Sequence, residues 1–78
     1  MKIIYKNVDS VDFRKLPLSW TISSLRNFFS KTQKIPVGQM KLMVKVDENS
    51  PEEEISEDHK TVGFYVTSSE SIIIVDMK

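Results

Sequence analysis

Apolar and polar side chains alternate along residues 2–7 with the two-residue period of a β-strand. Ile3 and Tyr5 share one face of this predicted strand, and Ile4 lies on the other. A polar turn follows, and residues 11–16 then form a second candidate strand. The pattern therefore predicts an N-terminal β-hairpin.

The period changes to that of an α-helix after residue 21. Four apolar residues repeat on one helical face: Ile22, Leu25, Phe28 and Phe29. The opposite face is polar and includes Arg26. Thr21 is placed to act as the N-cap, and Pro36 prevents the helix from continuing. We expect this helix to pack its apolar face against a sheet.

Two further strands flank a long acidic stretch. Residues 40–45 alternate again, with Leu42 on one face and Met43 on the other. Residues 71–75 contain four consecutive β-branched side chains, which is typical of a central strand buried on both faces or of a strand with an exposed apolar stripe. Between them, residues 47–58 (the acidic segment) hold seven acids and no base, which predicts a solvated loop with at most a short strand.

The predicted order of elements is strand, strand, helix, strand, short elements, strand. With one long helix, the fold class is α+β, and the helix packs across one face of a mixed sheet of four to five strands. The last strand can run parallel beside the first in the middle of the sheet, which accounts for its apolar character. This is the β-grasp, or ubiquitin-like, arrangement, and we expect one domain that spans residues 1–78.

The composition is that of an ordinary soluble globular domain, since 40% of the residues are hydrophobic and 28% are charged. The absence of cysteine excludes disulfides and thiol chemistry. The longest apolar run, residues 72–75, is far shorter than a membrane span, and the N-terminus lacks a signal-peptide pattern. We therefore expect a monomer of the cytosol or nucleus with no membrane partner.

Charge is strongly segregated along the chain, although the formal net charge is zero. Residues 1–46 hold nine basic and two acidic residues, whereas residues 47–78 hold two basic and nine acidic ones. Four lysines of the predicted strands could form a basic sheet face: Lys2, Lys6, Lys41 and Lys45. No aromatic pair is interleaved with them, as stacking of single-stranded RNA would require. A solvated charged surface is therefore favoured over nucleic-acid binding, which stays open as an alternative.

No residue pattern points to catalysis, a metal or a cofactor. The only histidine, His59, falls next to the acidic segment, with no predicted nucleophile beside it. The adjacent acids Glu52–Glu54 lack the pocket that acid–base catalysis requires. Asp47-x-Asn49 opens like a calcium loop, but Glu52 stands where an EF-hand needs glycine. We expect a protein that is not an enzyme and that has neither a cofactor nor a metal site.

Protein binding has the strongest support. On the sheet face turned away from the helix, the pattern places Met43, Ile72 and Ile74 on neighbouring strands, with Lys41 and Lys45 beside them. An exposed apolar group with a charged rim is typical of a modest protein interface. We therefore predict these five residues as the protein-binding site. The alternative is that the acidic segment or the C-terminal residues fold over this face.

Several segments resemble the ubiquitin-like domain of the tubulin-folding cofactor E (tubulin-specific chaperone E) family. The resemblance lies in Leu16–Pro17, Thr21–Ile22, Phe29–Ser30, Lys34–Ile35–Pro36–Val37, Leu42, Phe64–Tyr65 after an acidic stretch, and the terminal aliphatic strand. It covers nearly the whole chain, and Met43 falls where ubiquitin has the central residue of its recognition patch. Ubiquitin ends in a Gly-Gly tail that is activated for conjugation, whereas this chain ends at Asp76–Met77–Lys78, so we expect a domain that binds and is not a modifier.

The resemblance implies a C-terminal interaction module of a longer chaperone that also carries a CAP-Gly domain and leucine-rich repeats. Such a chaperone assembles and dissociates the α/β-tubulin heterodimer in the cytoplasm, in association with the cytoskeleton. The implied partners are tubulin, other tubulin-folding cofactors and, as a further candidate, the proteasome. Two alternatives stay open: a free-standing β-grasp adaptor, and an RNA-binding β-grasp domain that uses the basic sheet face.

Overall fold

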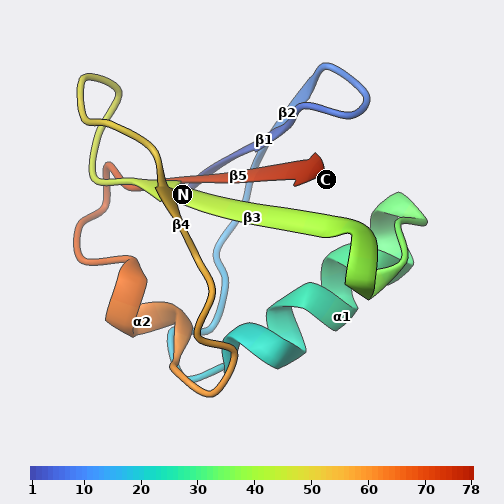
Figure 1. Cartoon of the computed structure of the whole chain (residues 1–78). Helices are drawn as coiled ribbons and strands as arrows, with labels where there is room; N and C mark the ends of the chain where they lie inside the picture. The colour runs from blue at the N-terminus through green and yellow to red at the C-terminus, as the bar shows by residue number, and fades with distance from the viewer.

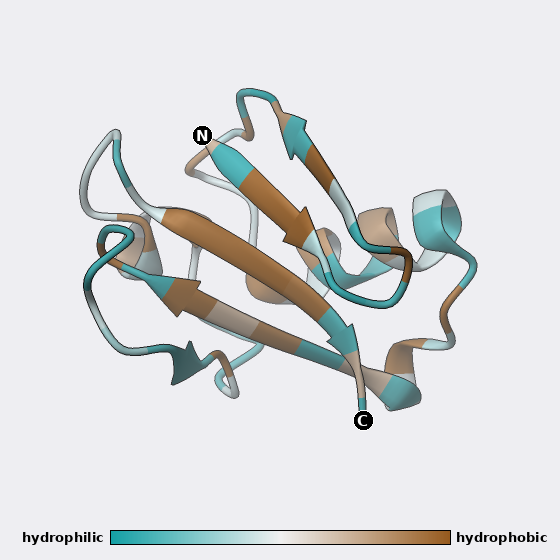
Figure 2. Ribbon diagram, turned by 90° about the horizontal axis from the view of Figure 1, so that it is seen from above, coloured by the Kyte–Doolittle hydropathy of each residue, from teal (hydrophilic) through white to brown (hydrophobic).

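Strand β5 lies in the middle of the sheet (Figure 1) and is hydrophobic along most of its length (Figure 2). The computed structural model describes all residues from 1 to 78. Five strands form one sheet in the order β2-β1-β5-β3-β4: β1 (Lys2–Tyr5), β2 (Ser10–Phe13), β3 (Met40–Lys45), β4 (Glu53–Glu54) and β5 (Ile72–Met77). β1 runs parallel to β5, and the other pairs are antiparallel. The predicted α+β, β-grasp arrangement is confirmed, although β2 ends three residues earlier than the pattern suggests.

Helix α1 (Ile22–Gln33) packs across one face of the sheet, which we call the inner face; the opposite face is the outer face (Figure 1). The helix begins as predicted, because the Thr21 side chain accepts a hydrogen bond from the backbone N–H of Ser24 (3.2 Å). The helix ends at Lys34, whose φ of 56° is left-handed, and the 3₁₀ turn η1 (Val37–Gln39) then leads into β3.

The main core lies between α1 and the inner face of the sheet. Alternate residues of the three central strands point to this face: Ile3, Tyr5, Leu42, Val44, Ile73 and Val75. Ile22, Leu25 and Phe29 of the helix are buried against them. The rings of Phe29 and Tyr5 meet edge to face, with their centroids 5.9 Å apart. The helical and strand periods read from the sequence therefore converge on one core.

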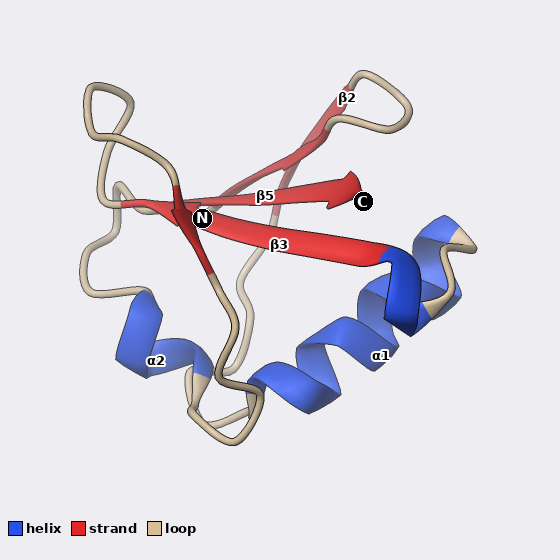
Figure 3. Ribbon diagram, in the orientation of Figure 1, coloured by secondary structure: helices blue, strands red, loops and turns tan.

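A second helix, α2 (Val62–Tyr65), lies below the same end of the sheet as the start of α1 (Figure 3). The sequence pattern does not predict it, because four residues are too few to show a helical period. Backbone hydrogen bonds join the starts of the two helices: Ile22 N–H donates to the Lys60 carbonyl (2.8 Å), and Val62 N–H donates to the Trp20 carbonyl (2.7 Å). These bonds hold the chain that follows the acidic segment against α1.

The helical pattern places Arg26 on the polar, solvated face of α1, but the structure shows it partly buried. Its side chain is only 11% exposed and links three segments of the chain. The guanidinium donates to the backbone carbonyls of Met40 (3.1 Å) and Ile55 (2.7 Å), and it forms an ion pair with the Asp58 carboxylate (2.8 Å). Periodicity misses this role, because a long side chain can run from a polar helix position into a partly buried site.

We expect Arg26→Ala to lower the free energy of unfolding by about 2–4 kcal/mol, because it leaves two carbonyl groups and the Asp58 carboxylate without their partner. Denaturant unfolding measures the loss. Asn27→Ala, at an exposed position of the same helix, is the control and should change stability by less than about 0.5 kcal/mol. An equally small cost for Arg26→Ala would contradict the linking role.

Candidate protein-interaction surface

The strand register places an apolar row across four strands on the outer face of the sheet. In order across the sheet, the row consists of Val11, Ile4, Ile74 and Met43. The neighbouring row consists of Phe13, Lys2, Ile72 and Lys45. Met43, Ile72 and Ile74 therefore lie on the face opposite α1, as the sequence predicts.

These three residues are buried, which contradicts the expectation of an exposed apolar group. Met43 is 7% exposed, Ile72 is 3% exposed and Ile74 is 1% exposed. Together with the partly buried Ile4, they form a small cluster separate from the main core. We call this group (Ile4, Met43, Ile72 and Ile74) the outer cluster. The outer cluster cannot contact a partner through its own side chains while they remain buried.

Lys2 of β1 and Lys6, which directly follows β1, reach across β5 above the outer cluster. The ammonium of Lys2 is 3.1 Å from the Glu48 carboxylate, and that of Lys6 is 3.1 Å from the Glu52 carboxylate. Both glutamates belong to the β3–β4 connection (residues 46–52), which rises above the outer face in Figure 1. Because β5 lies between β1 and β3, each ion pair spans β5. The two pairs therefore bridge β5 on the outer face.

Glu48 is held from both sides of Ile72. In the strand register, Ile72 lies between Lys2 and Lys45. The Lys45 ammonium donates to the Glu48 backbone carbonyl (2.9 Å), while Lys2 pairs with the Glu48 carboxylate. Aliphatic lysine stems cover apolar surface while their charged ends stay in water. The structure thus supports the alternative in which the acidic segment covers this face.

The charges that are segregated along the sequence are paired in space. Three of the four ion pairs join residues 1–46 to the acidic segment: Lys2–Glu48, Lys6–Glu52 and Arg26–Asp58. The first two involve solvent-exposed side chains, so each is worth at most about 1 kcal/mol. Three of the four lysines of the predicted basic face bind the acidic segment, namely Lys2, Lys6 and Lys45. This pairing disfavours the RNA-binding alternative.

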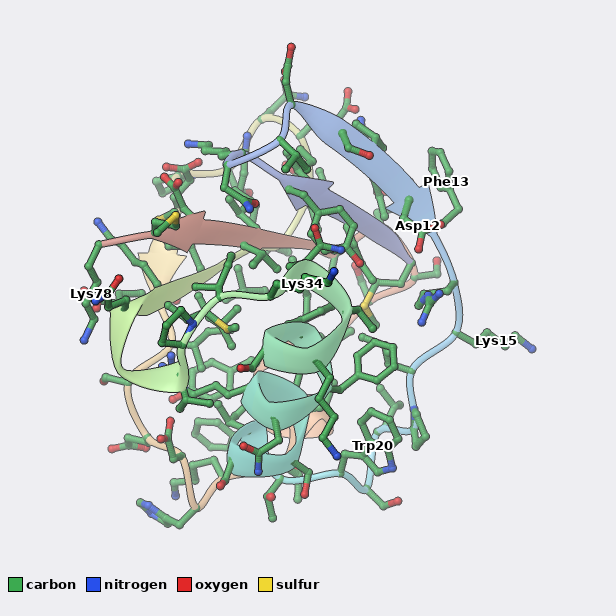
Figure 4. The ribbon with its side chains drawn as sticks, turned by 90° about the vertical axis from the view of Figure 1, so that its right-hand side faces the viewer. Asp12, Phe13, Lys15, Trp20, Lys34 and Lys78 are labelled. Carbon is green, nitrogen blue, oxygen red and sulfur yellow. The ribbon has the colours of Figure 1, made fainter.

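The exposed apolar part of the outer face lies on the edge strand β2. Phe13 is 72% exposed and Val11 is 51% exposed, and the Phe13 side chain projects from the rim of the molecule (Figure 4). Val11 is paired with Ile4, so the exposed residues border the outer cluster. The pattern places Val11 and Phe13 on one strand face without showing which. Their pairing with Ile4 and Lys2 in the hairpin is the signal that would have located them.

The ionisable side chains show no arrangement for acid–base or metal chemistry. No group of three or more metal-binding side chains lies close together, and His59 is exposed in a turn. Burial raises the pKa of the Tyr5 phenol above its ordinary value of 10.0; the Asp12 carboxylate adds to the rise, and Arg14 opposes it. The phenol therefore stays protonated at neutral pH. None of the helices has the length and apolar character needed to cross a membrane.

A family model for the ubiquitin-like domain matches residues 2–78, which is nearly the whole chain. No curated protein sequence matches the chain. The comparison with known proteins therefore rests on this family model and on solved structures that share the fold.

Solved structures of tubulin cofactors share this fold. The C-terminal ubiquitin-like domain of mouse tubulin-specific chaperone e has 22% identity and a TM-score of 0.86, over 100% of this chain and 84% of that one. The N-terminal ubiquitin-like domain of tubulin-binding cofactor B from Drosophila melanogaster has 19% identity and a TM-score of 0.85, over 99% and 81%. Tubulin-binding cofactor B from Trypanosoma brucei has 20% identity and a TM-score of 0.79, over 97% and 90%. Likeness at these identities establishes the fold.

Burial of the outer cluster predicts that Ile74→Glu lowers the free energy of unfolding by more than about 3 kcal/mol, because it places an unpaired carboxylate in the centre of the sheet. Val11→Glu, at the exposed end of the same row, should cost less than about 1 kcal/mol. Denaturant unfolding of the two variants measures the difference, and equal costs would show that the outer cluster is open to water. A glutamate pair at Met43 and Ile74 would likewise perturb folding rather than report on binding.

Proposed function

Because the chain belongs to the ubiquitin-like domain family, we propose that it is a non-conjugating protein-interaction domain that acts in tubulin folding. In this proposal it is the C-terminal module of a chaperone similar to tubulin-folding cofactor E, which assembles and dissociates the tubulin heterodimer. Its partners are tubulin or other tubulin-folding cofactors, with the proteasome as a further contact. It works in the cytoplasm, in association with the cytoskeleton, as a monomer without catalytic activity.

The observation that carries the proposal is the exposed apolar surface of Val11 and Phe13, which continues into the outer cluster. Large exposed apolar side chains that adjoin a charged rim are typical of protein interfaces. In this proposal the residues predicted from the sequence have two roles: Met43, Ile72 and Ile74 form the floor of the surface, and Lys41 and Lys45 form its rim. Phe13 is the natural anchor, because a few residues carry most of the binding energy of an interface and aromatic side chains are enriched there.

The likeness to tubulin cofactor domains supports the choice of partner. Two different cofactors, chaperone e and cofactor B, contain ubiquitin-like domains of this shape. The alternative is a free-standing β-grasp adaptor, which would bind other proteins but neither tubulin nor its cofactors. Binding to purified components therefore separates the two hypotheses.

The test is binding of the purified chain to purified α/β-tubulin and to purified tubulin-folding cofactors by biolayer interferometry. We expect Phe13→Glu to weaken binding to at least one of them by about tenfold or more, equivalent to about 1.4 kcal/mol, without a change in Tm.

Leu18→Glu is the matched control. Leu18 is 53% exposed, but its carbonyl accepts from the Gly63 N–H of α2, on the inner side of the sheet. The control variant should bind as the parent chain does. Equal affinities of the two variants would reject the Phe13 surface, and a parent chain that binds neither tubulin nor any cofactor would favour the adaptor.

A further inference from the structure

The β3–β4 connection turns at residues 47–50 and places two glutamate carboxylates on lysines of the outer face. Lys2 of β1 and Lys6, which directly follows β1, are four residues apart, which corresponds to about 13 Å between Cα atoms in an extended chain. Glu48 and Glu52, which pair with them, are also four residues apart. The two ion pairs are made entirely by side chains. An extended segment with two carboxylates four residues apart spans about the same 13 Å and can present both carboxylates to the two lysines.

We propose that the outer face binds an extended acidic segment of a partner protein, whose carboxylates replace Glu48 and Glu52 on Lys2 and Lys6. This inference rests on the proposed function of the outer face and names the chemistry of its partner. The partner segment carries two carboxylates four residues apart, and an apolar side chain beside the carboxylate on Lys2 would add a further contact. The β3–β4 connection is then a stand-in ligand that the partner displaces.

The site for the apolar side chain lies next to Lys2. An open pocket of about 440 Å³ there has Lys2, Phe13, Glu48 and Ile72 among its lining residues. Phe13 is directly opposite Lys2 in the strand register. A partner carboxylate on Lys2 would therefore bring its neighbouring side chain against the exposed Phe13 ring, which has no ring partner of its own. Withdrawal of Glu48 would also uncover Ile72 beneath it.

The exchange is energetically accessible, because both ion pairs are exposed to water and exposed pairs are weak. The tether still gives the β3–β4 connection an advantage, since a tethered segment acts at an effective concentration in the millimolar range. Removing the two carboxylates therefore raises the affinity for an acidic peptide by about 3- to 10-fold.

An acidic peptide fits this face better than RNA does. Single-stranded RNA is held by two or three stacked aromatic side chains, whereas Phe13 is in no aromatic pair. The carboxylates that the lysines already bind come from a polypeptide segment of this chain. RNA is therefore an outcome that the experiment checks rather than the proposed ligand.

The probe is a fluorescent peptide that copies residues 46–54 of this chain, and its control carries glutamine at the positions of Glu48 and Glu52. The protein variant is E48Q/E52Q. The matched variant is E53Q/E57Q, which removes the same number of charges from exposed residues that form no ion pair. Affinities are measured by anisotropy, and the site is mapped by NMR titration.

We expect E48Q/E52Q to bind the probe about 3- to 10-fold more tightly than the parent chain and E53Q/E57Q do. The titration should shift the signals of Lys2, Phe13 and Ile72, and binding should weaken with salt and with K2Q/K6Q. Equal affinities of the two variants, or shifts confined to other residues, would overturn the inference. Tighter binding of a ten-nucleotide oligouridylate to the same face would also overturn it.

The results distinguish failure of this inference from failure of the proposed function. Unchanged tubulin or cofactor binding with no binding of the acidic probe rejects the acidic ligand alone. Probe binding at Lys2 and Lys6, with Phe13→Glu and Leu18→Glu equal in tubulin and cofactor binding, supports the acidic ligand and rejects the proposed tubulin surface.

Discussion

Strand β5 is apolar on both of its faces, whereas the chain has only one long helix to cover them. Ile73 and Val75 are buried under α1, and Ile72 and Ile74 are buried on the opposite face. A central strand with β-branched residues on both sides needs a cover on both sides. Helix α1 covers one face of β5, so the rest of the 78-residue chain has to cover the other face.

The second cover is made of charged side chains and a raised connection rather than of another helix. Lys2 of β1 and Lys6, just after it, pair across β5 with glutamates of the β3–β4 connection, and Lys45 of β3 holds that connection from the other side. This pairing explains the separation of charge along the sequence, because the acidic segment neutralises the lysines that shield the outer cluster. Such a cover keeps apolar surface from water while its ion pairs remain exposed and exchangeable. The proposed interaction surface, which would open by exchange of these ion pairs, is compatible with a stable sheet.

The helix and the strands could be predicted because their signals are local. The Thr21 cap, the apolar face that begins at Ile22 and the alternation in residues 40–45 each lie within a few neighbouring positions. The cover of the outer face depends instead on long-range pairs: Lys2 and Glu48 are 46 positions apart, and Arg26 and Asp58 are 32 apart. The periodicity of apolar residues does not indicate such long-range pairs. It therefore placed Met43 and Ile74 on the correct face but could not show that they are buried.

Solvent paramagnetic relaxation of the isoleucine methyl groups measures this cover most directly. With a soluble gadolinium probe, the account predicts that the Ile72 and Ile74 methyls relax as slowly as those of Ile22 and Ile73 in the main core, while the Val11 methyls relax fast. Added salt at about 1 M, which screens exposed ion pairs, should speed relaxation at Ile72 and Ile74 but not at Ile22. Relaxation at Ile72 and Ile74 as fast as at Val11, without added salt, would contradict the account.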